Sequence, residues 1–117
     1  MDIDFFNHNF GKQFTVSFRY TSANWEGTRF GFETAVAYDD GYTEYYGSAV
    51  HSSANGEAIS SNTIQFPTEH GKAKNILYCF LYVIGTTSGT VTVYKPQIEL
   101  GNIATDWTPA PEDLIRT

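Results

Sequence analysis

Residues 30–50 read FGFETAVAYDDGYTEYYGSAV, and this stretch indicates the fold class. In its first nine residues, the apolar side chains of Phe30, Phe32, Val36 and Tyr38 share one face, two or four positions apart. Alternation with period two is typical of a strand with one buried face. Asp-Gly at positions 40 and 41 supplies the positive φ angles of a tight turn, and residues 42–50 form the return strand. The stretch therefore predicts an antiparallel β-hairpin.

The two strands of this hairpin also predict features on their other faces. Gly31, Ala35 and Ala37 share a face with Glu33, and such small side chains indicate close approach by another group. Tyr45 and Tyr46 are adjacent, so their side chains must point to opposite faces of the strand. At least one of these two rings therefore lies outside the core.

The alternating pattern continues on both sides of the hairpin. Residues 13–20 (QFTVSFRY) and 90–94 (TVTVY) alternate, and residues 59–66 (ISSNTIQF) form a more polar strand. Residues 76–84 (ILYCFLYVI) are apolar on both faces, which predicts a central strand covered on both sides. Polar stretches predict loops at residues 21–27, 52–56 and 68–75. We expect an all-β fold, a two-sheet antiparallel β-sandwich of seven or eight strands, and chain order leaves jelly-roll and immunoglobulin topologies open.

Composition bounds the functions open to this chain. Its 117 residues suit one domain, and 16% of them are aromatic. The formal net charge is −6 and no cluster of Lys or Arg is present, which argues against nucleic acid and against an anionic membrane surface as partners. The sequence begins Met-Asp-Ile-Asp, which is unlike a signal peptide, and the apolar run at residues 76–84 is too short to span a bilayer.

Patterns typical of catalysis are missing from the sequence. His8, His51 and His70 lie in separate segments without zinc-ligand spacing. The lone Cys79 lies in the apolar run, where we expect a small buried side chain. Carboxylates near the hairpin, at Glu33, Asp39, Asp40 and Glu44, could form the pair that glycoside hydrolysis needs, but turn formation and solvation explain them as well. We expect that the protein is not an enzyme.

The end of the chain carries a resemblance to a known family. Residues 90–100 form a last strand, and a polar segment follows it. This segment resembles the closing motif of carbohydrate-binding jelly-roll modules in tail and baseplate proteins of phages infecting Gram-positive bacteria, of the distal tail or baseplate accessory type. The matching residues are Glu99, Gly101, Ala104, Thr105, Asp106, Trp107, Thr108, Pro109, Ala110, Pro111, Glu112 and Asp113.

The resemblance implies a fold, a place and a partner. It favours jelly-roll topology for a module over residues 1–113, with Trp107 as a structural residue and residues 114–117 as a linker to the rest of a parent protein. It implies a virion protein of the tail tip or baseplate that binds host cell-surface polysaccharide and other tail or baseplate proteins. Jelly-roll sugar-binding modules often hold a calcium ion. Here oxygen ligands could come from Asp2, Asp4, Asp39, Asp40 and Asp106, without calcium-loop spacing, so no cofactor is expected.

Candidate saccharide-binding residues are aromatic side chains that the core does not require, with polar side chains beside them, because rings stack on the C–H faces of sugars. Trp25 lies in a predicted loop, Tyr42 and Tyr45 lie next to the turn, and a second set could align on one sheet face. For each aromatic residue, burial in the core is the alternative. The candidates are Arg19, Trp25, Asp39, Asp40, Tyr42, Tyr45, Tyr78, Tyr82 and Tyr94.

Two other functions remain open at this point. A structural spacer or assembly domain of the virion would bind no sugar. A binding module appended to a cell-wall or polysaccharide hydrolase would share the fold and the site, and a neighbouring catalytic domain in the parent protein would distinguish it.

Overall fold

The computed structural model describes residues 2–101, and most of them lie in strands. The part of the closing motif from Ala104 to Asp113, with Trp107, and the expected linker at residues 114–117 lie outside this range. A single helical turn precedes the strands. The elements are α1 (Asp4–Asn7), β1 (Gln13–Tyr38), β2 (Thr43–Gln65), β3 (Ala73–Ile84) and β4 (Ser88–Leu100).

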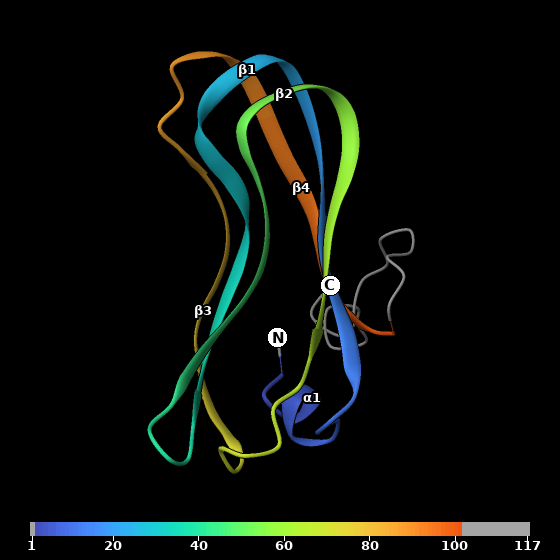
Figure 1. Cartoon of the computed structure of the whole chain (residues 1–117), viewed down its shortest axis with the longest axis vertical. Coiled ribbons are helices and arrows are strands. Elements are labelled where there is room, and N and C mark those ends of the chain that lie inside the picture. Colours follow the sequence, from blue (N-terminus) through green and yellow to red (C-terminus); the bar gives the residue numbers. More distant parts are fainter. Residues whose placement is uncertain (1, 102–117) are drawn as a thin grey trace, which may run out of the picture.

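Strand β1 lies at the centre of the fold. It pairs antiparallel with β2 over nearly its whole length, from Gln13 opposite Gln65 to Ala37 opposite Thr43. On its other side, the first half of β1 pairs with β4 and the second half pairs with β3, also antiparallel. One layer is therefore β2–β1–β4 and the other is β2–β1–β3, with β1 and β2 arching from one layer into the other (Figure 1).

We expected seven or eight strands, but residues 2–101 form four, because β1 and β2 continue through the bend between the two layers. We predicted loops at residues 21–27 and 52–56, but both segments lie inside continuous strands. The register between β1 and β2 shifts twice there, between Ser22 and Trp25 and between Glu26 and Arg29. Extra residues of this kind bend a strand and increase its twist without ending it. The backbone also takes positive φ at Asn24 and Ser52, at 47° and 73°.

The core lies between the two layers. Both halves of β1 contribute to the core, because every second side chain of each half points into the space between the layers. The rings of Phe18 and Phe30, from opposite halves, lie 6.1 Å apart at an angle of 78°. At the end away from the bend, Phe6 of α1 packs against Phe66 and Tyr46. The predicted antiparallel β-sandwich is confirmed, whereas the described strands are fewer than the roughly eight of a jelly roll.

Strand β3 corrects a second prediction. The apolar run at residues 76–84 was expected to be a central strand covered on both sides, with Cys79 buried. Within residues 2–101, β3 pairs only with β1, so it is an edge strand whose second edge has no neighbouring strand. Cys79 is exposed, although it accepts a hydrogen bond from Thr34 Oγ1. The exposed apolar side chains on this strand are Leu77, Phe80, Val83 and Ile84.

Candidate functional site

The face of the β2–β1–β3 layer that points away from the core, called the outer face below, gathers aromatic side chains around a floor of small residues. Side chains directly opposite each other on paired strands share a face. Three cross-strand rows follow from the register. They are Ala49–Gly31–Tyr82, Gly47–Glu33–Phe80 and Tyr45–Ala35–Tyr78.

A shallow depression of about 210 Å³ lies on this outer face. Tyr45 and Tyr82 line it from the two flanking strands, and Glu33 lines it from the central strand. The glycines in and beside the floor are required by close contacts: a Cβ at Gly47 would lie 2.6 Å from the Phe32 carbonyl oxygen, and a Cβ at Gly31 would overlap the Ser48 carbonyl oxygen. The full lining is Phe32, Glu33, Tyr45, Gly47, Ser48, Ala49 and Tyr82.

The polar groups of the outer face are fixed by contacts between β1 and β3. The Tyr78 hydroxyl donates a 2.6 Å hydrogen bond to Glu33 Oε2. This bond to the carboxylate raises the pKa of Tyr78 to about 12. The Arg29 guanidinium lies 5.7 Å from the centre of the Tyr82 ring, within the range of a cation–π contact. The depression therefore has one carboxylate held in place beside aromatic rings.

We expect Glu33→Gln to lower the pKa of Tyr78 from about 12 towards the ordinary value of 10.0, because the carboxylate favours the neutral phenol that donates to it. The ¹³Cζ shift of Tyr78, followed between about pH 9 and pH 12, measures this. An unchanged titration in the variant would show that the hydrogen bond does not form in solution.

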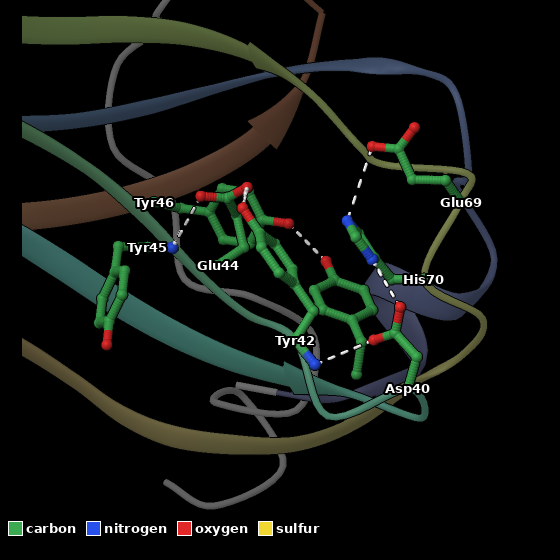
Figure 2. Close-up of polar contacts among 8 residues, drawn as sticks. Asp40, Tyr42, Glu44, Tyr45, Tyr46, Glu69 and His70 are labelled. Carbon is green, nitrogen blue, oxygen red and sulfur yellow. Dashed lines mark hydrogen bonds and ion pairs between the residues drawn. The ribbon is translucent and has the colours of Figure 1, made fainter.

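A second set of interacting side chains lies at the turn between β1 and β2 (Figure 2). It consists of Asp40, Tyr42, Glu44 and His70 and is called the turn cluster below. The Tyr42 ring stacks on His70 at a centroid distance of 3.9 Å and an angle of 9°. Asp40 Oδ2 lies 2.7 Å from His70 Nδ1, and the Tyr42 hydroxyl donates to Glu44 at 2.9 Å. The hydrogen bond with His70 lowers the pKa of Asp40. These contacts fasten the hairpin turn to the loop that precedes β3.

We expect His70→Ala to raise the pKa of Asp40 towards 3.8, because its main stabilising partner is removed. Since the folded-state pKa lies below the unfolded value, the contact stabilises the fold above the unfolded pKa. Its contribution is lost as the pH falls through the folded-state pKa. The Asp40 ¹³Cγ shift across an acid titration measures the change. If Asp40 titrates identically in both proteins, His70 is not its partner.

The predicted site residues near the turn lie in two different places, the depression and the turn cluster. Tyr45 is 59% exposed and Tyr46 is 1% exposed, so the prediction that one of these two rings lies outside the core is confirmed. Tyr45 lines the depression and points away from the turn cluster (Figure 2). Asp40 and Tyr42 belong to the turn cluster, and Asp39 is exposed on the turn itself. His70 was not predicted, because nothing in the sequence signals a contact across 30 residues.

Trp25 corrects a prediction about the site. Its side chain is 0% exposed, its ring packs edge-on against Phe30 at 4.9 Å, and its Nε1–H donates to Thr86 Oγ1 at 2.9 Å. The residue lies at the bend of β1 and fills the space between the layers there. A ring buried in this way offers no face to a ligand, so Trp25 is a core residue.

The predicted alignment of Arg19, Tyr78, Tyr82 and Tyr94 on one sheet face is also wrong. Arg19 lies opposite Tyr94 in the β1–β4 pairing, which belongs to the other layer. Tyr78 and Tyr82 lie on β3. The bend places the two pairs in different layers, because β1 passes from one layer to the other between them.

A wider hollow of about 600 Å³ lies at the bend. It is mainly polar, but several of these groups already bond to one another. Asn24 N–H donates to Asn55 Oδ1 at 2.9 Å, and the Ser88 hydroxyl donates to Glu26 Oε2 at 2.9 Å. This hollow therefore offers a ligand fewer free groups and no open aromatic ring. Its lining is Asn24, Trp25, Glu26, Ser53, Ala54, Asn55 and Ser88.

In residues 2–101, no three His, Cys, Asp or Glu side chains come together in a group that could hold a metal ion. Asp106, one of the calcium ligands considered, lies outside this range. No helix within the same range is long and apolar enough to cross a membrane.

Fold and site together define an antiparallel β-sandwich with an open aromatic face on one layer. No family model matches the chain, and no curated protein matches it in sequence. Among solved structures, the fold is similar to a chain of the tripod (BppUct-A-L) from the baseplate of bacteriophage Tuc2009, with a TM-score of 0.52 and 20% sequence identity. The match covers 92% of this chain but only 42% of that one. At this level of identity, the similarity concerns the fold alone.

Proposed function

We propose that this chain is a non-catalytic carbohydrate-binding module of a phage tail or baseplate protein, which binds saccharide of the host cell wall during adsorption. The observation that carries the proposal is the outer face. Its depression combines Tyr45 and Tyr82 with a fixed carboxylate, at Glu33, over a floor of small residues.

The chemistry of the outer face suits a sugar. Sugar rings present C–H patches that stack on aromatic faces, and hydroxyl groups at the rim that pair with polar side chains. Tyr45 is the most exposed of the large apolar side chains in residues 2–101. Glu33 can accept hydrogen bonds from sugar hydroxyls while it keeps its bond from Tyr78, because a carboxylate has about four acceptor positions.

The phage context rests on two independent similarities. The fold is similar to a chain from a phage baseplate tripod, and the terminal segment resembles the closing motif of phage sugar-binding modules. In a virion, such a module would act at the tail tip together with other baseplate proteins. Shallow sites bind weakly one at a time, and many copies on one tail would provide strong adhesion through effective concentration.

The non-catalytic part of the proposal rests on the lining of the depression. Glu33 is the only carboxylate among its lining residues. Glycoside hydrolysis by the usual route needs two carboxyl groups about 5–10 Å apart. A binding module attached to a separate hydrolase domain has the same site and would be recognised from the parent protein.

A second candidate function is supported by strand β3. An edge strand with exposed apolar side chains is a surface that can pair with another chain, so an assembly domain of the virion would use it. Leu77, Phe80, Val83 and Ile84 are exposed on this strand. Such a domain needs no saccharide, and cell binding therefore separates the two candidates.

The experiment is staining of intact Gram-positive cells by the fluorescently labelled protein, in competition with polysaccharide purified from the same walls. We expect the protein to stain the strains whose wall polysaccharide it binds, and the staining to be lost when that polysaccharide is added at saturation. The Tyr45→Ala, Tyr82→Ala double variant should not stain them. Staining that survives saturating polysaccharide would mean a different receptor. No staining of any Gram-positive strain tested would favour the assembly domain.

A further inference from the structure

We propose that the depression on the outer face binds a saccharide through a protonated amino group, with Glu33 as its counter-ion and the rings of Tyr45 and Tyr82 beside it. This inference rests on the proposed function and names its ligand class: a sugar with a free amine, rather than an N-acetylated or acidic sugar.

The position of Glu33 is the first reason. It lies on the central strand of its layer, between Gly47 on one side and Phe80 on the other, and it is partly buried. Its one hydrogen-bond partner in residues 2–101 is the Tyr78 hydroxyl, and no Lys or Arg of this range forms an ion pair with it. The carboxylate keeps acceptor positions for a charged partner, because the phenol of Tyr78 occupies only one of about four. A ligand cation would supply that partner.

The aromatic lining is the second reason. Faces of tyrosine rings attract cations, and aromatic rings are what proteins use to recognise ammonium groups. Tyr45 and Tyr82 come from strands on opposite sides of β1, so they border the space above its small side chains. The floor of Gly47 and Ala49 lets a ligand group approach the backbone closely.

The charge around the site favours the same class of ligand, a sugar with a free amine. The chain carries a net charge of −6, which raises the local concentration of cations. Arg29 is a nearby cation, but it lies over the Tyr82 ring and is not among the residues lining the depression. A phosphate or carboxylate in the depression would face Glu33 at close range and be repelled. The site is therefore built to exclude acidic sugars.

The experiment compares two oligosaccharides that differ only in this group: a β-1,4-linked glucosamine tetramer and its fully N-acetylated counterpart. Affinities would be measured by calorimetry or by NMR titration of the whole chain, at about 20 mM and about 500 mM salt. We expect the amine form to bind about tenfold more tightly at low salt, and the preference to shrink at high salt. Equal affinities, or tighter binding of the N-acetylated form, would overturn the inference.

Matched variants localise the effect. Glu33→Gln keeps the shape of the side chain and removes its charge, and we expect it to abolish the preference. Glu44→Gln is the control, because Glu44 also accepts a hydrogen bond from a tyrosine hydroxyl but lies in the turn cluster, outside the depression. The comparison of the two tetramers on the unaltered protein stands even if a variant fails to fold. A preference that persists in folded Glu33→Gln would contradict the assignment.

The inference and the proposed function fail in distinguishable ways. Binding of purified wall polysaccharide without a preference for the amine tetramer overturns the inference and leaves the proposed function standing. If neither tetramer binds and the wall polysaccharide does not bind either, both the inference and the proposed function are overturned. Chemical N-acetylation of the wall polysaccharide should weaken its binding about tenfold if its free amines are recognised.

Discussion

Replacing Trp25 with alanine is expected to lower the free energy of unfolding by about 3–5 kcal/mol, the usual cost of removing a large buried aromatic side chain. The indole is fully buried at the bend of β1, packs against Phe30 and donates a hydrogen bond to Thr86. Its removal would leave a cavity between the layers and an unpaired hydroxyl. Urea denaturation followed by circular dichroism measures the change.

Trp25→Phe is the matched control for this substitution. It keeps most of the apolar volume and loses the hydrogen bond to Thr86, so we expect a smaller loss, of about 1–2 kcal/mol. Neither variant should change saccharide affinity under conditions where it is folded, because the ring offers no face to a ligand. A stable Trp25→Ala variant that no longer binds saccharide would mean that Trp25 is exposed in solution and contacts the ligand.

Removing both Tyr45 and Tyr82 is expected to weaken saccharide binding by about 10- to 100-fold, because each stacked ring contributes on the order of 0.5–1.5 kcal/mol beyond its buried area. The two rings line the same depression from β2 and from β3. Stability should change little for Tyr45→Ala, since this side chain is 59% exposed. Calorimetry with purified wall polysaccharide measures the affinity of each single variant and of the pair.

Tyr94→Ala provides the comparison for these variants. Tyr94 is a partly buried tyrosine of β4, opposite Arg19 in the other layer, and it does not line the depression. We expect its affinity for saccharide to remain within about twofold of the unaltered protein. The reverse result, with binding lost in Tyr94→Ala and retained in the Tyr45 and Tyr82 variants, would move the site to the other layer.

Local patterns in the sequence predicted the hairpin and the position of its turn correctly, although of Asp40 and Gly41 only Gly41 has a positive φ angle. The turn forms at Asp39–Gly41, with φ of +90° at Gly41 and a hydrogen bond from its N–H to Tyr38. The alternation of side chains along a strand also predicted that Tyr45 and Tyr46 point to opposite faces. It likewise predicted that Gly31, Glu33 and Ala35 share the face away from the core. These predictions depend only on the period of a strand and the geometry of a tight turn, which neighbouring residues determine.

Other features depend on contacts that a local pattern does not contain. The polar stretch around Asn24 indicated a loop, yet pairing with β2 and β4 on its two sides keeps it in a bent strand. The apolar residues of β3 indicated a covered strand, although the number of neighbours of a strand is a property of the whole sheet. The contact between Asp40 and His70 likewise joins two segments that only the folded chain brings together.

The most direct test of the central claim is NMR mapping of the saccharide on the isotopically labelled protein. If the outer face of the β2–β1–β3 layer is the binding site, added wall polysaccharide should shift the signals of Glu33, Tyr45, Gly47, Ala49 and Tyr82, and leave those of Arg19 and Tyr94 unchanged. Shifts confined to the β1–β4 pair, to the hollow at the bend, or to the turn cluster would contradict the claim.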